Sequence, residues 1–176
     1  ILPECEFSLE STLHNLNLSK VRLLESLGVN RFSIGVQTFS DKGRKLLNRV
    51  HDKKGAIEHL KMIRQNFSGM VCTDIIFNYS GQTIDEVLED ARLVDELNID
   101  STSFYSLQLF EKSQLAKTVS QDYYDVNYEH KLHNAFFEKL LSTGNYEVLE
   151  HTKFNRIGRD RYQYIRLSHE GADILP

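Results

Sequence analysis

The sequence predicts an α/β protein built on a parallel sheet. Short strand-like and helix-like segments alternate along its 176 residues. The segments that join successive strands are helical and ten or more residues long, which favours parallel strands with right-handed crossovers. Residues 70–77 are almost entirely apolar, a pattern typical of a strand buried on both faces of a parallel sheet. Either a doubly wound sheet or part of a β/α barrel fits; four strands are too few to close a barrel, so a barrel would be present only as an arc.

The first third of the chain predicts a strand, a helix and a second strand. Residues 5–10 alternate between apolar and polar, as a half-buried strand does. Residues 12–27 carry leucine and valine near helical spacing, with Ser19 as a candidate cap for the second part and Gly28 as the terminating residue. A strand follows over residues 31–37.

The middle of the chain predicts two helices before the apolar strand. Ser40 or Asp41 can cap a short helix that runs through Leu47. Residues 54–67 place their apolar side chains on one helical face, and a Ser-Gly pair then ends the helix before the strand at 70–77.

The last part predicts one more strand between helices. Thr83 can cap a helix whose first turn is acidic, which suits the helix dipole. A fourth strand is expected over residues 103–109, a long helix near 123–142 and a short strand at 146–149. An irregular basic tail completes the chain.

Composition excludes several classes of protein. The formal charge of −4 and a pI near 6.0 argue against nucleic acid as the main partner. No apolar run is long enough to span a membrane, and no signal-like stretch opens the chain. Cys5 and Cys72 are too few for a disulfide framework, a structural zinc site or an iron–sulfur cluster, and we expect both to be small buried hydrophobes on strands. A start at Ile1 and an apolar end at Pro176 suggest a piece of something longer.

Polar residues at strand ends are the first candidates for a site, because sites in both architectures lie at the carboxyl ends of the strands. Glu10 and Gln37 end the first two predicted strands, and Gln108 lies at the end of the fourth. Asp74 lies within the apolar strand, where a carboxylate costs several kcal/mol unless it is paired. A structural aspartate that bonds loop amides is the alternative.

Several basic residues and histidines have two interpretations. Arg49 follows the short helix and, from the residues alone, is more simply a solvated cation at a helix end. His130 and His133 lie three apart on a predicted helix, but no third ligand accompanies them, so we predict no metal site. The tail either binds carboxylates or is an ordinary basic edge; its cations are Lys153, Arg156, Arg159, Arg161 and Arg166.

Four motifs resemble one family. The run GVNRFSIGVQTF at residues 28–39, followed by LLNRVH at 46–51, resembles the "GxxRxSxGVQSF … LxRxH" signature of HemN-like radical S-adenosylmethionine (SAM) proteins. DIIFNYSGQT at 74–83 resembles the family's "DLIxGxPGQT" segment, and SFYSL at 103–107 its "SxYxL" strand. Residues 147–156 are similar to its "YExxxxxxFxR" stretch.

The resemblance implies a fold and cofactors. The family's fold is a partial (β/α)6 TIM-type barrel, so residues 1–120 would supply strands three to six with their outer helices, and residues 121–176 a flanking helix and the start of the C-terminal region. The full-length family proteins use SAM and a [4Fe–4S] cluster held by a CxxxCxxC motif, which this chain lacks.

The resemblance also assigns SAM-binding roles. Glu10 matches the glutamate of the family's third strand, Gln37 the glutamine of "GVQ", Arg49 the arginine of "LxRxH" and Asp74 the aspartate of "DLI". Gln108 stands where the family has its next contact. Carboxylates suit the ammonium or the ribose hydroxyls, an amide suits ribose, and arginine suits the methionyl carboxylate.

The implied function is that of a cytoplasmic radical SAM protein acting on a tetrapyrrole, with this chain inactive alone. The first candidate is the oxygen-independent coproporphyrinogen III oxidase, an oxidoreductase that decarboxylates propionates to vinyls in porphyrin biosynthesis. The alternatives are a haem-utilisation enzyme of the HutW/ChuW branch, a non-enzymatic haem chaperone of the HemW type, and a cluster-free α/β binding domain that has lost the chemistry. The residues FNY at 77–79 resemble the haem-utilisation branch more, whereas Ser80 and Asn48 depart from the usual proline and glycine. The implied partners are coproporphyrinogen III or haem and an electron donor such as flavodoxin, and an open barrel arc favours self-association.

Overall fold

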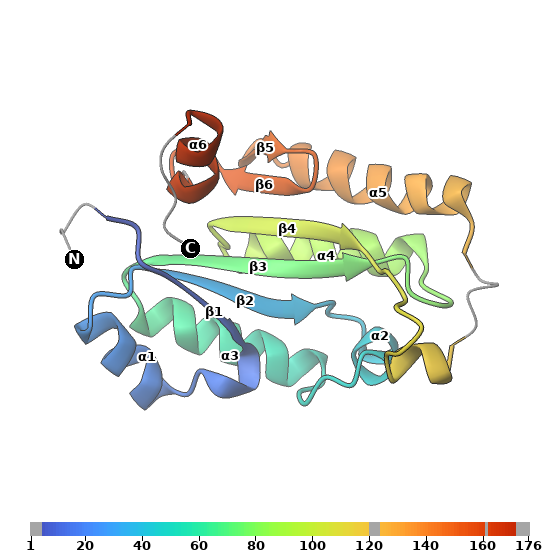
Figure 1. The fold of residues 1–176 in the computed structure, drawn as a ribbon, viewed down its shortest axis with the longest axis horizontal. Helices are drawn as coiled ribbons and strands as arrows, with labels where there is room; N and C mark the ends of the chain where they lie inside the picture. The colour runs from blue at the N-terminus through green and yellow to red at the C-terminus, as the bar shows by residue number, and fades with distance from the viewer. Residues whose placement is uncertain (1–4, 120–123, 161, 172–176) are drawn as a thin grey trace.

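The computed structural model describes residues 5–119, 124–160 and 162–171. A six-stranded sheet runs through it in the order β1-β2-β3-β4-β6-β5 (Figure 1). Four neighbouring strands are parallel: β1 (Ser8–Thr12), β2 (Arg31–Gln37), β3 (Met70–Phe77) and β4 (Ser101–Ser106). An antiparallel hairpin extends the sheet beyond β4, made of β5 (Tyr146–Glu150) and β6 (Lys153–Arg156).

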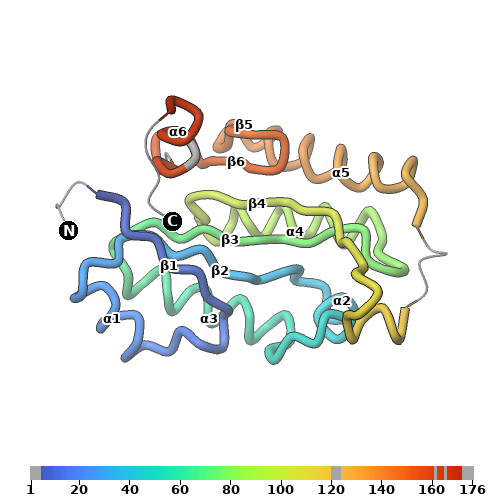
Figure 2. The backbone as a smooth tube through the Cα atoms, viewed as in Figure 1, coloured from blue at the N-terminus to red at the C-terminus, as the bar shows by residue number. Residues whose placement is uncertain are grey.

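The helices connect the strands and lie mainly on one face of the sheet (Figure 2). The longer ones are α1 (Leu18–Ser26), α3 (Lys53–Asn66), α4 (Ile84–Glu96) and α5 (Val126–Leu141). The shorter ones are η1 (Leu13–Asn15), α2 (Asp41–Leu46), η2 (Leu115–Lys117) and α6 (Gln163–His169). In Figure 1, α2 lies beside the carboxyl ends of the parallel strands, and α6 lies near their amino ends.

The core lies between the sheet and the longer helices. Phe32, Val71 and Phe104 are fully buried on the helix side of β2, β3 and β4. Leu60 of α3 and Phe136 of α5 pack into the same cluster. Complete burial of an aromatic or branched side chain contributes about 1.5–3 kcal/mol, so this layer supplies most of the stabilisation.

The opposite face of the sheet is polar. The strand register aligns one row of side chains across five strands, namely Glu10, Ser33, Cys72, Ser101 and Asn155. The next row toward the carboxyl ends is Thr12, Gly35, Asp74, Ser103 and Lys153. We call these two rows the polar face. The prediction that residues 70–77 are buried on both faces is therefore wrong for this side, where Asp74 is partly exposed.

The first predicted elements are largely confirmed. The strands at 31–37 and 70–77 have the predicted bounds, whereas β1 begins and ends a few residues later than predicted. The predicted helix at 12–27 is divided into η1 and α1, and Asn17 rather than Ser19 caps α1 by accepting a hydrogen bond from the Lys20 N–H. Gly28 follows α1 with a φ of 95°, the left-handed conformation that a terminating glycine adopts most easily.

The predicted caps of the middle helices are also confirmed. The Ser40 side chain accepts from the Gly43 N–H at the start of α2. Thr83 and Glu86 form a reciprocal capping box at the start of α4. β4 begins two residues before the predicted strand and ends at Ser106. The predicted start of the long helix, at 123, lies outside the described residues.

The C-terminal tail is more ordered than its sequence predicts. β6 forms within it and pairs antiparallel with β4, so the sheet is not wholly parallel. A strand of four residues has too short a pattern to be recognised, and its pairing depends on a distant partner. β6 belongs to the predicted second part of the chain, yet it pairs with a strand of the first 120 residues. The predicted division into two domains at 120/121 therefore stays a prediction. None of the described helices has the length and apolar character needed to cross a bilayer.

Candidate functional site

The end of β2 is an irregular segment that carries Gln37. The register with β3 shifts between Gly35 and Gln37, and Gln37 has a φ of 74°, which is uncommon for a residue with a side chain. The Gln37 amide folds back over Gly35, where an added Cβ would lie 2.6 Å from Nε2. Glycine at position 35 therefore leaves the space that this amide occupies.

Arg49 lies in the loop between α2 and α3. Its backbone N–H donates to the Arg44 carbonyl at 2.8 Å, and its Nε donates to the Leu47 carbonyl at 2.7 Å. Asn48 before it has a φ of 52°, which asparagine tolerates better than most residues. This explains how asparagine serves where the family's motif has glycine. Among the residues that the structure describes, none accepts a hydrogen bond from the terminal nitrogens of Arg49.

A pocket of about 490 Å³ brings Gln37 and Arg49 together. Its other lining residues come from α2, β3 and the segment around η2: Leu46, Leu47, Asn48, Ile76, Gln114, Leu115 and Thr118. The Gln37 Oε1 atom is buried and has no hydrogen-bond partner within the described part of the chain. A buried amide oxygen without a partner costs about 1–3 kcal/mol, so a ligand donor at this position would be stabilising.

A second, smaller pocket lies on the other side of Arg49. It has a volume of about 220 Å³, and Gly35, Arg44 and His51 contribute to its wall. Arg49, Asn48 and the loop they belong to line both pockets, so this loop separates them.

Asp74 and Glu10 lie on the polar face, where Asp74 is the register partner of the pocket residue Gly35. Asp74 accepts a hydrogen bond from the Ser33 hydroxyl at 3.3 Å. Glu10 is exposed on β1, opposite Ser33 and one row nearer the amino ends. Both carboxylates thus lie on the side of the sheet that the four longer helices leave uncovered.

Of the five predicted residues, Gln37 and Arg49 line these pockets, whereas Glu10, Asp74 and Gln108 line neither. Gln108 follows β4 and is exposed. Gln114, Leu115 and Thr118 close the larger pocket instead. The sequence offers no periodic pattern or motif over this segment, so its contribution could not be predicted.

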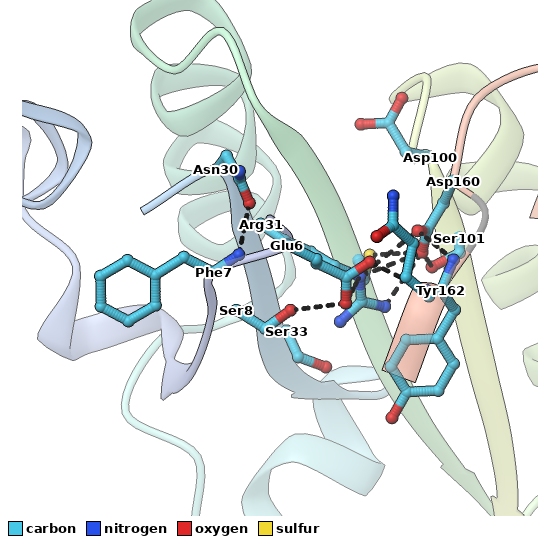
Figure 3. Close-up of polar contacts among 12 residues, drawn as sticks. Glu6, Phe7, Ser8, Asn30, Arg31, Ser33, Asp100, Ser101, Asp160 and Tyr162 are labelled. Carbon is cyan, nitrogen blue, oxygen red and sulfur yellow. Dashed lines mark hydrogen bonds and ion pairs between the residues drawn. The ribbon is translucent and has the colours of Figure 1, made fainter. Parts of the chain in front are cut away.

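A buried ion pair joins Arg31, at the start of β2, to Asp160, and Figure 3 shows its contacts. Asp160 accepts hydrogen bonds from the Arg31 Nη2 at 3.0 Å and from the Ser101 hydroxyl at 2.6 Å. Burial opposes ionisation of Asp160, but the hydrogen bonds and charge of Arg31 lower its pKa to about 2. The Tyr162 ring covers Arg31, with 4.4 Å between the guanidinium carbon and the ring centroid. This cluster stabilises the amino-terminal end of the barrel arc, opposite the end that carries Gln37.

Most cations of the basic tail have partners within the fold. Arg156 pairs with Asp95 and Arg159 pairs with the buried Asp100. The Lys153 ammonium lies 3.2 Å from the centroid of the Tyr162 ring. Arg161 lies outside the described residues. The pairs make the tail an integral edge of the fold, which favours the structural interpretation over carboxylate binding.

The two cysteines do not fit a [4Fe–4S] cluster. Cys5 is exposed and precedes β1, contrary to the prediction of a buried strand residue. Cys72 is buried on β3, where burial raises the pKa of its thiol far above the ordinary value. Cluster ligands are thiolates, usually four of them. Within the described ranges no group of three or more His, Cys, Asp or Glu residues could hold a metal ion.

The residues around the larger pocket do fit SAM. Gln37 has a buried amide oxygen without a partner, and Arg49, whose terminal nitrogens have no acceptor within the described part of the chain, lines the same pocket. A ribose hydroxyl can donate to the first group, and a carboxylate can accept from the second.

A parallel barrel arc with its polar groups at the carboxyl ends defines a TIM-type β/α protein. The family model described as the radical SAM superfamily matches residues 1–94, more than half of the chain, so the chain belongs to the radical SAM superfamily. The family implies SAM and a [4Fe–4S] cluster in its full-length proteins.

Individual relatives identify the chain as a HemN-like member. It is 25% identical over 178 residues to the anaerobilin synthase of Escherichia coli O157:H7, covering 99% of this chain and 40% of that protein. It is 26% identical over 151 residues to the heme chaperone HemW of Buchnera aphidicola subsp. Acyrthosiphon pisum, covering 85% of this chain and 40% of that protein.

A solved structure shows the same fold. Coproporphyrinogen III oxidase (HemN) from Escherichia coli, a radical SAM enzyme, superposes with a TM-score of 0.78 and 21% identity. The alignment covers 96% of this chain and 38% of that one. The chain therefore spans about two fifths of the proteins it matches, and the predicted partial barrel with outer helices is confirmed as its fold.

Proposed function

We propose that this chain forms the SAM-holding part of the barrel in a HemN-like radical SAM protein that acts on a tetrapyrrole. The observation that carries the proposal is the larger pocket, which Gln37 and Arg49 line together, while the Gln37 Oε1 is buried beside it without a hydrogen-bond partner among the described residues. One is an acceptor for a ribose hydroxyl, and the other is a donor for a carboxylate. SAM carries both groups.

The other site residues have complementary parts in this proposal. Arg49 binds the methionyl carboxylate through paired N–H donors, a geometry that lysine cannot reproduce. Asp74 and Glu10 present carboxylates to the ammonium or the ribose. Gln108 lines neither pocket, so the contact proposed for it from the segment after β4 lies outside the pocket that Gln37 and Arg49 share. When SAM is bound beside a [4Fe–4S] cluster, it supplies radical chemistry, and the protein supplies orientation and exclusion of water.

Two reactions are candidates for the whole protein. Oxidative decarboxylation of coproporphyrinogen III is the first candidate from the sequence motifs. The fold shared with coproporphyrinogen III oxidase supports it. A haem-utilisation reaction has a more specific observation in its favour, because the relative named anaerobilin synthase aligns with 99% of this chain. A haem chaperone is the non-enzymatic alternative, supported by the HemW relatives. An electron donor such as flavodoxin would serve either enzyme.

Titration calorimetry of the 176-residue chain with SAM tests the proposed site. We expect binding to the unmodified chain and a loss of roughly tenfold or more in Arg49→Ala, since a charge-assisted hydrogen bond contributes about 1.5–3 kcal/mol. Arg22→Ala is the matched control, because Arg22 is an exposed arginine on α1 and should leave the affinity unchanged. Equal affinity in Arg49→Ala and the unmodified chain would remove Arg49 from the site.

The reaction is tested on the protein expressed from its complete coding sequence. Anaerobic incubation with SAM, a reductant and either coproporphyrinogen III or haem should consume only the true substrate. Tight haem binding with no consumption of either compound would favour the chaperone.

Self-association belongs to the same proposal. Among the described strands, β1 and β5 each have a neighbour on one side only, and unpaired strand edges promote pairing between molecules. Sedimentation of the chain over a range of concentrations should show a rising mean mass; a constant monomer mass would contradict this expectation.

A further inference from the structure

Arg44 is a buried arginine on α2 whose Nε and Nη1 atoms both donate to main-chain carbonyls. The residue is 3% exposed. Nη1 donates to the Val36 carbonyl at 3.0 Å and to the Thr38 carbonyl at 2.7 Å, and Nε donates to the His51 carbonyl at 2.6 Å. No carboxylate of the described residues forms an ion pair with it.

These three carbonyls belong to the two segments that carry the proposed SAM contacts. Val36 and Thr38 are the residues immediately before and after Gln37. His51 lies two residues after Arg49, and the Arg44 carbonyl accepts from the Arg49 N–H at 2.8 Å. One side chain therefore joins the Gln37 backbone to the Arg49 loop.

Asp90 of α4 holds the same loop from the other side. Its carboxylate accepts from the Thr38 hydroxyl at 2.9 Å and from the Phe39 N–H at 2.7 Å. Gln37 has a positive φ, which persists only where the surrounding structure compensates for the strain. The backbone on both sides of Gln37 is thus bonded, whereas no described residue donates a hydrogen bond to its side-chain oxygen.

We propose that Arg44 is a positioning residue that fixes the spacing between the Gln37 amide and the Arg49 guanidinium, and thereby favours a ligand with a ribose at one end and an amino-acid carboxylate at the other. This inference rests on the proposed function, because it assumes that these two groups bind the same molecule. Arg44 itself touches no ligand in this scheme.

A two-part ligand and its fragments should respond differently when the spacing is released. S-adenosylhomocysteine must bind the Gln37 amide and the Arg49 guanidinium at the same time. A variable distance between these two groups therefore weakens its binding. 5′-Methylthioadenosine lacks the amino-acid part and needs only the Gln37 side of the pocket. A purely structural role for Arg44 would weaken both ligands equally through loss of folded protein.

The test compares Arg44→Lys with Arg64→Lys in the 176-residue chain by titration with the two ligands. Lysine keeps the charge, but its donors share one nitrogen and cannot reach three separated carbonyls. Arg64 is a matched control, because its Nη1 bonds the buried Asp100 at 2.6 Å and it lines neither pocket near Arg49. We expect Arg44→Lys to weaken S-adenosylhomocysteine about tenfold and 5′-methylthioadenosine less than about threefold, with neither affinity changed in Arg64→Lys.

A ligand-free measurement separates this inference from the proposed function. The amide chemical shifts of Arg44→Lys should differ from those of the unmodified chain at residues 36–39 and 49–51. The amide chemical shifts of β3 should stay the same. An equal loss of affinity for both ligands would overturn the positioning role. Unchanged amide chemical shifts in both loops would also overturn it, and either result would leave the proposed SAM site intact. If neither ligand binds the unmodified chain, the proposed function fails, and the NMR comparison still decides whether Arg44 sets the two loops.

Discussion

Single buried charges have two different roles in this fold, and Asp160 is the clearest structural one. Its carboxylate accepts from Arg31, Ser101 and the Tyr162 N–H, so one residue of the tail joins β2 and β4. Arg31 and Asp160 are 129 residues apart in the sequence. Such a pair stabilises little relative to apolar residues, but its loss leaves a buried charge without compensation.

We therefore expect Asp160→Ala to lower the free energy of unfolding by about 3–5 kcal/mol, measured by urea denaturation. Glu170→Ala is the control, because Glu170 pairs with Arg166 on an exposed surface and its loss should cost less than about 1 kcal/mol. Similar destabilisation in the two variants would show that the Arg31–Asp160 pair contributes no more than a surface pair.

Asp90 gives the fold a pH dependence of a definite sign. Complete burial raises its pKa from 3.8 to about 7, although Phe39 and Thr38 donate hydrogen bonds to the carboxylate. The folded state therefore binds more protons than the unfolded state between these two values. The stabilisation is fully present below about pH 4 and is lost as the pH rises to about 7.

Relative to Asp90→Asn, the unmodified chain should lose up to about 1.4 kcal/mol of stability per pH unit within that range. Urea denaturation at several pH values between 4 and 8 measures the difference. Parallel stability profiles for the two proteins would mean that Asp90 is ionised throughout and that its hydrogen bonds outweigh burial.

At the scale of elements, local signals determine the helix ends, and α1 shows where they fail. Ser19 has a residue type suited to a cap, but the chain turns at Asn17, whose side chain accepts from the Lys20 N–H at 3.0 Å. Ser19 donates to that same Asn17 oxygen. The residue type at position 19 does not reveal where the chain turns, because the position of the turn depends on how η1 packs.

Asn17→Ala should accordingly destabilise the protein by about 1 kcal/mol, whereas Ser19→Ala should cost only a few tenths. Thermal unfolding of both variants makes the comparison within a single turn of helix. A larger loss of stability in Ser19→Ala than in Asn17→Ala would show that Ser19, the residue that the sequence suggests, caps the helix.

For the whole molecule, the two cysteines limit its chemistry. Neither is suited to a cluster, since Cys5 is exposed outside the strands and Cys72 is buried against Asp160 with a Sγ–Oδ2 distance of 3.1 Å. We expect no iron–sulfur absorbance after anaerobic reconstitution of this chain with iron and sulfide. A stable brown protein with a broad band near the visible region would contradict this, and Cys5→Ser together with Cys72→Ser would show whether the cysteines hold it.

Much of the fold was open to prediction from the sequence. β2 and β3 have the predicted bounds because their apolar residues and flanking breaks are local signals. Gly28, Ser40 and Thr83 end or begin helices as expected, since each acts through the nearest backbone groups. Glu10, Gln37 and Asp74 could be picked out as candidates because polar residues near strand ends are conspicuous in an apolar pattern.

Other features depend on residues that are distant in the sequence. β6 forms only because β4 offers an edge about 50 residues earlier, and Asp160 becomes a buried anion only where Arg31 meets it. The residues alone favoured a solvated Arg49, and only the family motif suggested otherwise. The sequence by itself determined β2, β3 and the helix ends at Gly28, Ser40 and Thr83, since these follow from short-range pattern. Tertiary structure alone decided that Gln37 and Arg49 share one pocket and that Arg44 ties their loops together, because burial and hydrogen-bond partners arise when distant segments pack.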